Sequence, residues 1–292
     1  MTEPSRAALR SLMFVPSHQE RMVDRALGTA ELDVAILDLE DGVPYAERAG
    51  GRARLATLLE SRPTMPGPAR YVRVNAPNTN DLVADLDAVV RAGLDGVVLP
   101  KVDSTDDLRA AVAALQARER EAGVAAVALL VSIESARGLL AAPALAAEPR
   151  VTGLLFGAED FALDLGLPAE REAEASDLLH ARSSVVVAAA ASRRVAIDGI
   201  WPDLTDEDGL RADARRGRLL GFVGKTLIHP KQIQTINECF TPSAAELEEA
   251  RRIVEAFERA KADGKGAVAF DGKLLDPPIV DRARRMIGAA RK

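Results

Sequence analysis

The chain has 292 residues, a formal net charge of −6, 48% hydrophobic residues and 28% charged residues. This length fits one large α/β barrel or two ordinary domains, and the composition is that of a globular enzyme with a substantial core. The acidic balance and an aromatic content of 3% exclude nucleic acid as an expected partner. The most apolar helical stretch, residues 184–191, is far shorter than the roughly 20 residues of a membrane span.

Cys239 is the one cysteine of the chain, so an intrachain disulfide and a Cys-rich metal site are both excluded. A reducing compartment fits this usage. The N-terminal residues show neither an apolar core nor a cleavage-like site typical of an export signal. We therefore expect a cytoplasmic protein with no membrane partner.

Eight short apolar runs, separated by helical patterns, follow one another through residues 1–240. Near-continuous apolar strands indicate a parallel sheet covered by helices, and eight strand–helix units close a TIM barrel. An open doubly wound sheet is the structural alternative, but no Gly-x-Gly-x-x-Gly follows the first strand. The expected strands are Leu12–Pro16, Val34–Leu39, Tyr71–Asn75, Gly96–Lys101, Ala128–Glu134, Gly153–Phe156, Ala196–Ile200 and Lys225–His229.

Residues 241–292 are expected to form a C-terminal extension of the barrel. Ser243 and Glu246 fit a capping box that begins a helix reaching about Ala262. Residues 267–275 resemble a short hairpin, and Pro277 is placed to begin a last helix. We expect this part of the chain to act as a mobile flap.

Two carboxylates stand at the ends of neighbouring predicted strands. Glu134 ends the fifth strand, and Asp160 follows the sixth. Reactive groups of βα barrels lie at the carboxyl ends of the strands, and Mg²⁺ commonly takes one or two carboxylates together with water and substrate oxygens. The pair therefore predicts a Mg²⁺ site, whereas no His, Asp or Glu spacing indicates zinc.

Arg73, near the end of the third strand, offers a planar fork of donors that matches the carboxylate of an oxo acid. The alternative is a structural salt bridge to Asp38 or Glu40. Of Glu40 and Asp41, one is expected to reach the site, because successive side chains of a strand alternate. We expect this to be Glu40, accepting hydrogen bonds from metal-bound water, while Asp41 suits a turn.

Pro100 and Lys101 end the fourth strand, where Pro100 is expected to contact the substrate. Lys101 has two interpretations. It is a candidate Schiff-base nucleophile, or a charge that balances the acidic residues. His18 and His229 also follow strands and are candidate ligand contacts.

The chain resembles the citrate lyase β-subunit and malyl-CoA lyase family, within the HpcH/HpaI aldolases, over nearly its whole length. The blocks that carry the resemblance are Arg10-Ser-Leu-Met-Phe-Val-Pro16, Ile36-Leu-Asp-Leu-Glu-Asp-Gly-Val-Pro44, Tyr71-Val-Arg-Val-Asn75, Val98-Leu-Pro-Lys101, Ser132-Ile-Glu-Ser-Ala-Arg-Gly138, Phe156-Gly-Ala-Glu-Asp160, Gly224-Lys-Thr-Leu-Ile-His-Pro230 and Gly272-Lys-Leu-Leu-Asp-Pro277. Any one block is a weak signal, but eight in order are specific.

This resemblance implies a TIM barrel and a Mg²⁺-dependent, reversible cleavage of a 3-hydroxyacyl-CoA into an acyl-CoA and a 2-oxo acid. It implies Glu134 and Asp160 as metal ligands and Arg73 as the oxo-acid clamp. Asp276 resembles the acid/base that a neighbouring subunit's flap supplies, with Asp281 as the weaker candidate, so a homo-oligomer, a trimer or hexamer, is implied. Ser17 stands where the family commonly has Gly, in the loop associated with the CoA end of the site, and Arg21 is the candidate CoA contact there.

Three other functions fit the same residues. A malate-synthase-like enzyme would follow Claisen condensation with thioester hydrolysis, and an oxo-acid aldolase would need no CoA. A citrate lyase β-type subunit would act within a multienzyme assembly. The sequence leaves open the acyl group and the oxo acid, since one methylene changes binding by only about 1–3 kcal/mol.

Overall fold

The computed structural model describes residues 8–61, 67–168, 177–262 and 268–289. Contacts within the described residues divide the chain into two compact units, one that ends at Phe240 and one that begins at Thr241.

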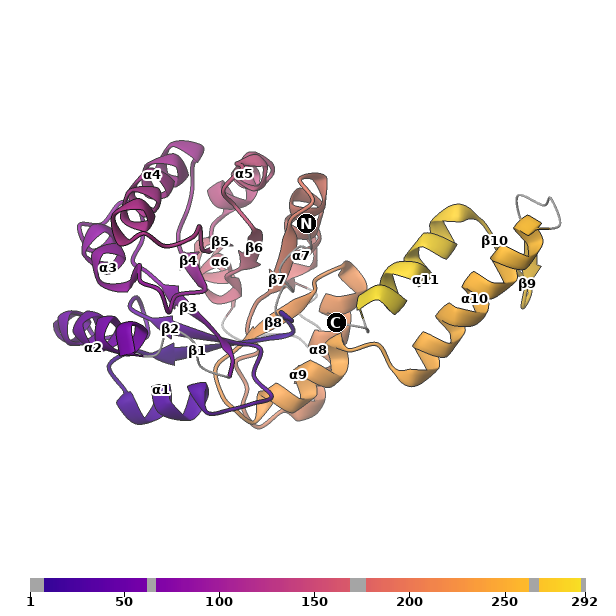
Figure 1. The fold of residues 1–292 in the computed structure, drawn as a ribbon, viewed down its shortest axis with the longest axis horizontal. Helices are drawn as coiled ribbons and strands as arrows, with labels where there is room; N and C mark the ends of the chain where they lie inside the picture. Colours follow the sequence, from indigo (N-terminus) through magenta and orange to yellow (C-terminus); the bar gives the residue numbers. More distant parts are fainter. Residues whose placement is uncertain (1–7, 62–66, 169–176, 263–267, 290–292) are drawn as a thin grey trace. The chain divides into compact units, whose positions relative to one another are not determined.

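Eight parallel strands form a closed barrel in the first unit (Figure 1). The ring closes because β1 pairs with β8 as well as with β2, with Leu12 opposite Thr226 on one side and Val34 on the other. This confirms the predicted TIM barrel. The strands are β1 (Ser11–Pro16), β2 (Val34–Asp38), β3 (Ala69–Arg73), β4 (Gly96–Leu99), β5 (Ala128–Ile133), β6 (Gly153–Phe156), β7 (Val195–Asp198) and β8 (Gly224–Leu227).

Six of these strands end one or two residues before the predicted position. The residues beyond their ends, such as Asn75, Lys101 and Glu134, lie in the βα loops. Arg73 and Asp38 are the last residues of their own strands. The functional residues therefore lie at the carboxyl ends of the strands or just beyond them.

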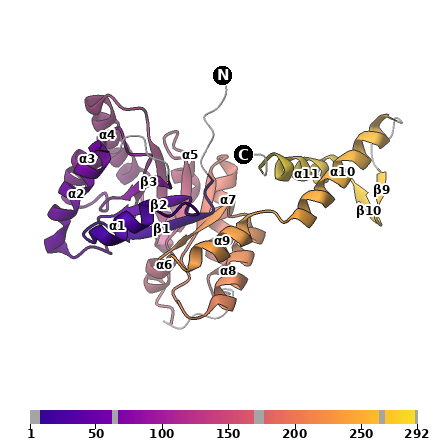
Figure 2. The same cartoon turned by 60° about the horizontal axis from the view of Figure 1, so that its bottom comes forward.

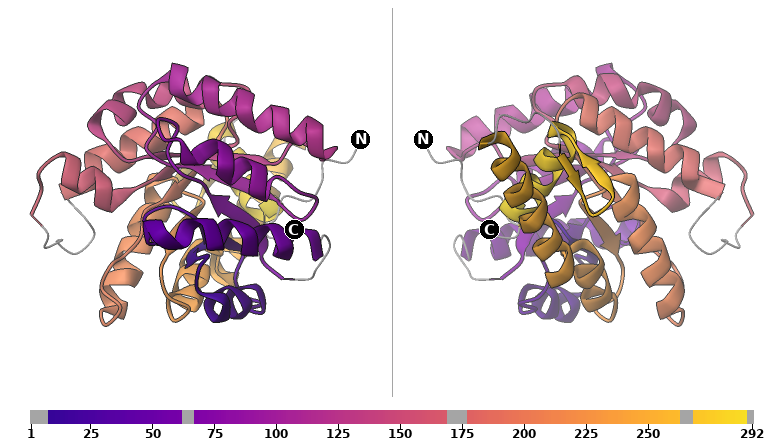
Figure 3. Two further views of the ribbon diagram at one scale, coloured as in Figure 1. Left: turned by 90° about the vertical axis from the view of Figure 1, so that its left-hand side faces the viewer. Right: turned by 90° about the vertical axis from the view of Figure 1, so that its right-hand side faces the viewer.

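Helices surround the barrel on its outer face (Figure 3). They are α1 (Glu20–Leu27), η1 (Tyr45–Glu47), α2 (Arg48–Ser61), α3 (Asp81–Val89), α4 (Thr105–Ala122), α5 (Ala136–Ala147), α6 (Ala158–Asp164), α7 (Leu179–Ala191), α8 (Glu207–Leu220) and α9 (Gln232–Phe240). α4 shows how the sequence sets such bounds. Ser104 caps its first turn by accepting a hydrogen bond from Asp107 N, and Gly123 ends it in the left-handed conformation.

Alternation of side chains along the strands creates two apolar layers. One layer fills the barrel interior and includes Ile36, Tyr71, Leu130, Leu155 and Ile197, all nearly inaccessible to solvent. The other, larger layer lies between the strands and the helices. Since both faces of every strand are covered, the strands read as continuous apolar runs in the sequence.

A fully buried cluster of four charges ties β7 and β8 to the helices outside them. Arg182 of α7 pairs with Asp198 at 2.6 Å and with Asp213 of α8 at 2.8 Å. Lys225 of β8 pairs with the same two carboxylates. Two cations thus neutralise two anions, and no member of the cluster is more than 2% exposed. Isolated charges would be very costly at this depth, so the four residues are mutually dependent.

The second unit contains α10 (Ala244–Ala262), β9 (Val268–Phe270), β10 (Lys273–Leu275) and α11 (Pro277–Ala289). Within this unit α10 and α11 lie side by side, and the antiparallel β9–β10 hairpin connects them (Figure 2). The predicted capping box is confirmed, because Ser243 Oγ accepts from Glu246 N and the Glu246 carboxylate accepts from Ser243 N. Ala267, the predicted first hairpin residue, lies outside the described residues. No described helix is long and apolar enough to cross a membrane.

Candidate active site

A cavity of about 300 Å³ opens at the carboxyl ends of the barrel strands. Its polar lining includes Arg73, Glu134 and Asp160, three residues predicted from the sequence to share one site. Apolar side chains from opposite strands form the remaining wall, among them Phe14, Leu155, Ile200 and Ile228. A concave apolar pocket with a few convergent polar groups is the usual form of a small-molecule site.

Arg73 is held in one orientation by three neighbours. Its Nε and Nη2 donate to the two carboxylate oxygens of Asp38, each at 2.7 Å, and its Nη1 lies 3.1 Å from Glu40 Oε2. Its guanidinium carbon lies 4.6 Å from the centroid of the Phe14 ring. The two hydrogen bonds to Asp38 use two of the five N–H groups of the guanidinium, which leaves N–H groups for a ligand in the cavity that Arg73 lines. Burial alone would lower the pKa of Arg73, but the charges of Asp38 and Glu40 raise it, so the residue stays cationic.

Both interpretations of Arg73 therefore describe the same side chain. It forms the salt bridges to Asp38 and Glu40, and it also lines the cavity. The cross-strand register explains this arrangement, since Asp38 of β2 lies directly opposite Arg73 of β3. An ion pair built into the barrel in this way pre-organises the guanidinium for an anion.

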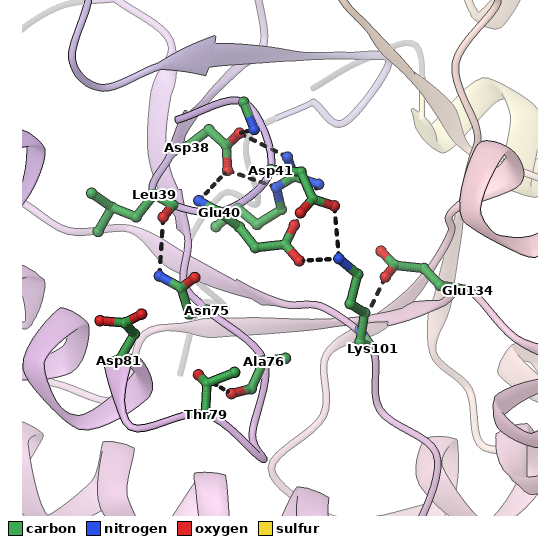
Figure 4. A network of polar contacts seen from close by, with 12 residues as sticks. Asp38, Leu39, Glu40, Asp41, Asn75, Ala76, Thr79, Asp81, Lys101 and Glu134 are labelled. Atoms are coloured by element: carbon green, nitrogen blue, oxygen red, sulfur yellow. Dashed lines mark hydrogen bonds and ion pairs between the residues drawn. The ribbon is translucent and has the colours of Figure 1, made fainter. Parts of the chain in front are cut away.

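Asp38 also shapes the loop that carries Glu40 and Asp41 (Figure 4). Its carboxylate accepts hydrogen bonds from Glu40 N at 3.0 Å and from Gly42 N at 2.8 Å. Sequence reasoning treated Asp38 only as a possible salt-bridge partner. The alternation of side chains along a strand could have indicated its role. Asp38 stands two residues after the inward-facing Ile36, so its side chain faces the barrel interior as well.

Lys101 bridges Glu40 and Asp41, as Figure 4 shows. Its ammonium lies 2.6 Å from Glu40 Oε1 and 2.7 Å from Asp41 Oδ2. Burial alone would lower the pKa of Lys101, but the two carboxylates raise it above its ordinary value. A Schiff-base lysine needs the opposite shift, because only the neutral amine attacks a carbonyl. The geometry thus favours the charge-balancing interpretation of Lys101.

Glu40 is 3% exposed, and its carboxylate faces Arg73 and Lys101 rather than the cavity. Burial raises the pKa of Glu40, while Arg73 and Lys101 act against that shift. Asp41 is more exposed and lines the cavity; burial would raise its pKa, but Lys101 lowers it. Glu40 is therefore placed to act through its two cationic neighbours.

Glu134 and Asp160 face the same cavity from neighbouring elements. Glu134 follows β5, whereas Asp160 lies in the first turn of α6. Burial raises the pKa of Glu134 to about 7, and the negative charges of Glu40 and Asp160 add to this rise. Lys101 N donates to Glu134 Oε2 at 3.1 Å. The pair thus forms an electronegative, partly desolvated corner of the cavity.

Gly157 allows Glu134 to occupy this corner. A Cβ at position 157 would lie 2.9 Å from Glu134 Oε1 and would collide with Glu134 Cγ. Any side chain there would displace the side chain of Glu134. The Gly that follows β6 is thus required by the close approach of Glu134.

The other sequence-predicted residues of the first unit do not line this cavity. Pro100 is buried behind the end of β4, and Arg21 is exposed on α1. His18 and His229 contact their own neighbours in sequence, Gln19 and Lys231. Asp276 belongs to the second unit, where its carboxylate accepts a hydrogen bond from Ile279 N at the start of α11. Within the described residues, no three His, Cys, Asp or Glu side chains form a closed metal cage.

A closed parallel barrel whose strand ends gather carboxylates and one buried guanidinium around a cavity is typical of an enzyme of the βα-barrel class. Comparison with known proteins narrows this class. The family model described as HpcH/HpaI aldolase/citrate lyase matches residues 10–230. The chain therefore belongs to the HpcH/HpaI aldolase/citrate lyase family and is a lyase, as the sequence blocks implied.

Two relatives and one solved structure illustrate the similarity. A (3S)-malyl-CoA thioesterase from Cereibacter sphaeroides is 38% identical, covering 96% of this chain and 94% of the relative. The citrate lyase subunit beta of Escherichia coli is 37% identical, covering 96% and 93%. The structure of CitE from Mycobacterium tuberculosis in complex with magnesium, acetoacetate and coenzyme A is 33% identical, with a TM-score of 0.75 and coverage of 98% and 100%.

Proposed function

We propose that this chain is a Mg²⁺-dependent lyase that reversibly cleaves a 3-hydroxyacyl-CoA of the malyl-, methylmalyl- or citramalyl-CoA type into an acyl-CoA and a 2-oxo acid. The observation that carries this proposal is the convergence of Arg73, Glu134 and Asp160 on one cavity. The magnesium and coenzyme A of the similar CitE structure support a Mg²⁺-dependent reaction of a CoA thioester.

The donor set of the cavity fits Mg²⁺. Glu134 and Asp160 supply two hard oxygen ligands, and the cavity leaves space for water and substrate oxygens, as Mg²⁺ prefers. The raised pKa of Glu134 shows that its charge lacks full compensation in the protein alone. When bound there, Mg²⁺ would act as a Lewis acid. It would stabilise the negative charge on the oxygen attached to the carbon at which the carbon–carbon bond breaks or forms.

Arg73 holds the carboxylate of the 2-oxo acid. Asp38 and Phe14 fix the guanidinium plane, so the N–H groups that do not bond Asp38 point in a set direction before the ligand arrives. This orientation lowers the entropic cost of placing the carbonyl beside the second substrate. The apolar wall formed by Leu155, Ile200 and Ile228 excludes water from the same space.

Asp276 is proposed as the acid/base, supplied by the flap of a neighbouring subunit in a homo-oligomer. In condensation its carboxylate would take the α-proton of the acyl thioester, and in cleavage it would return that proton to the enolate carbon. Its hydrogen bond from Ile279 N makes it the N-cap of α11. Asp276→Asn is a clean test because Asn caps a helix as well as Asp does but cannot shuttle a proton.

Three other functions stay open, and two of them are supported by relatives of similar identity that bear different names. The (3S)-malyl-CoA thioesterase supports hydrolysis of the thioester, which would release free CoA. The citrate lyase subunit beta supports action within an assembly, in which case the purified chain alone would not turn over acyl-CoA substrates. An oxo-acid aldolase would act on hydroxy acids without CoA.

A mass-spectrometric screen distinguishes these functions. Purified protein is incubated with malyl-, methylmalyl-, citramalyl- and citryl-CoA, with Mg²⁺ or with EDTA. We expect an acyl-CoA and a 2-oxo acid with Mg²⁺ and no product with EDTA, whereas free CoA without an oxo acid would indicate hydrolysis. Asp276→Asn should retain Mg²⁺ binding and abolish turnover. Turnover equal to wild type in this variant would contradict the acid/base role.

A further inference from the structure

We propose that Lys101 is a positioning residue that sets the metal-binding and oxo-acid-binding halves of the site in register. Its backbone N–H fixes Glu134, while its ammonium fixes Glu40 and, through Glu40, the guanidinium of Arg73. This inference rests on the proposed function, in which Glu134 binds Mg²⁺ and Arg73 binds the oxo acid.

The backbone of Lys101 adopts an uncommon conformation. Its φ of 53° places it in the left-handed region, which only Lys101, Arg193 and Asp271 share among the described non-glycine residues. Such a conformation is unfavourable for L-residues with a Cβ and persists where the surroundings require it. Here the turn out of β4 directs Lys101 N at Glu134 Oε2, 3.1 Å away on the loop after β5. The strained residue thus delivers a fixed donor to the proposed metal ligand.

The side chain of Lys101 leaves the same backbone in the direction of β2. It contacts Glu40 Oε1 at 2.6 Å and Asp41 Oδ2 at 2.7 Å. The second oxygen of Glu40 lies 3.1 Å from Arg73 Nη1. Glu40 is therefore a buried anion shared between two cations. Without Lys101 the carboxylate of Glu40 would pair with Arg73 alone and would compete with a ligand for its remaining N–H groups.

One residue thus performs two separable tasks. The backbone task needs a residue that tolerates the left-handed conformation, whereas the side-chain task needs a long cation. Asn tolerates positive φ, but a β-branched residue such as Val does not. Lys101→Asn should therefore remove the side-chain task alone, and Lys101→Val should remove both. Lys101→Arg keeps a long cation and tests rescue.

The test measures Mg²⁺ binding by calorimetry, and then pyruvate or glyoxylate binding at saturating Mg²⁺. In Lys101→Asn we expect Mg²⁺ affinity within about threefold of wild type and oxo-acid affinity at least about tenfold weaker. In Lys101→Val we expect Mg²⁺ affinity to fall about tenfold as well. Val disfavours the left-handed backbone, so the N–H of residue 101 would move away from the Glu134 carboxylate. Lys101→Arg should retain Mg²⁺ affinity and recover part of the oxo-acid affinity.

Thermal melts accompany each titration, because a purely structural lysine would lower the melting temperature of both neutral variants without separating the two affinities. If Lys101→Val does not fold, Lys101→Gly and Lys101→Ala repeat the comparison with a change of one methyl group. The inference would be overturned if Lys101→Asn and Lys101→Val, or Lys101→Gly and Lys101→Ala, bound Mg²⁺ with equal affinity. Unchanged oxo-acid affinity in Lys101→Asn would overturn it as well. Absence of Mg²⁺ and oxo-acid binding in wild type would instead contradict the proposed function.

Discussion

Replacing Glu134 by Gln should stabilise the metal-free protein at alkaline pH. The Glu134 carboxylate is 7% exposed and lies near the negative charges of Glu40 and Asp160. In the folded protein its pKa is raised from an ordinary value of 4.5 to about 7. A carboxyl group that binds its proton more tightly when folded costs stability once it ionises, so the free energy of unfolding falls as pH rises from about 4.5 to about 7 and is level above that range.

The size of the effect follows from the same pKa values. At about 1.4 kcal/mol per pH unit, the rise gives a penalty of about 3 kcal/mol at pH 8 and about 0.8 kcal/mol at pH 5. Gln has nearly the same shape as protonated Glu and its amide oxygen can accept the hydrogen bond from Lys101 N. Glu134→Gln should therefore exceed wild type by about 1 kcal/mol or less at pH 5 and by up to about 3 kcal/mol at pH 8.

Urea unfolding at pH 5 and pH 8, in EDTA and in Mg²⁺, measures these differences. Mg²⁺ at about one hundred times its Kd should stabilise wild type by about 2.7 kcal/mol at pH 8 and should stabilise Glu134→Gln much less. A variant that is less stable than wild type at pH 8 in EDTA would refute the reasoning, since it would mean that the ionised carboxylate is already compensated within the protein.

Three further substitutions test separate parts of the structure. Arg73→Lys should raise the KM for the oxo acid and lower kcat/KM at least about a hundredfold in steady-state assays, because an ammonium cannot form the two-pronged contact. Gly157→Ala should weaken Mg²⁺ binding at least about tenfold in calorimetry, because the new Cβ would displace Glu134, while the fold by circular dichroism is retained. Lys225→Met should lower the free energy of unfolding by about 3–5 kcal/mol, since it leaves a buried carboxylate uncompensated, and the added Asp213→Asn should recover part of that loss.

Each of these expectations has an outcome that contradicts it. An Arg73→Lys enzyme with wild-type kcat/KM would remove the guanidinium from substrate binding. Unchanged Mg²⁺ affinity in Gly157→Ala would mean that the carboxylate of Glu134 is not the ligand. A Lys225→Met protein as stable as wild type would show that Arg182 alone neutralises the buried cluster.

The barrel could be predicted from the sequence because the same strand pattern occurs eight times. Each strand is buried on both faces, so each appears as a short apolar run, and the number of runs determines the closed architecture. The positions of Glu134, Asp160 and Arg73 followed from the rule that strand ends carry the chemistry. Their convergence on one cavity is a property of the fold that spacing could indicate only indirectly.

Side-chain direction could not be predicted in the same way. The buried cluster of Arg182, Asp198, Asp213 and Lys225 lies outside the barrel wall, although Asp198 and Lys225 occupy strands and could equally have faced the cavity. The left-handed backbone of Lys101 was hidden as well, because lysine carries no signal for positive φ. These features depend on packing between elements distant in sequence, whereas the apolar runs depend on local pattern.

The seam between β1 and β8 has a consequence for synthesis of the chain. Ser11 pairs with Lys225, so the ring cannot close until the ribosome has made the whole stretch from residue 11 to residue 225. Until then the edge of β1 presents unsatisfied backbone groups that can pair with other nascent chains. A circular permutant that joins the ends of the chain and opens the ring between two other strands would make the β1–β8 pairing local, and its refolding rate would show how much of the folding barrier comes from that single closure.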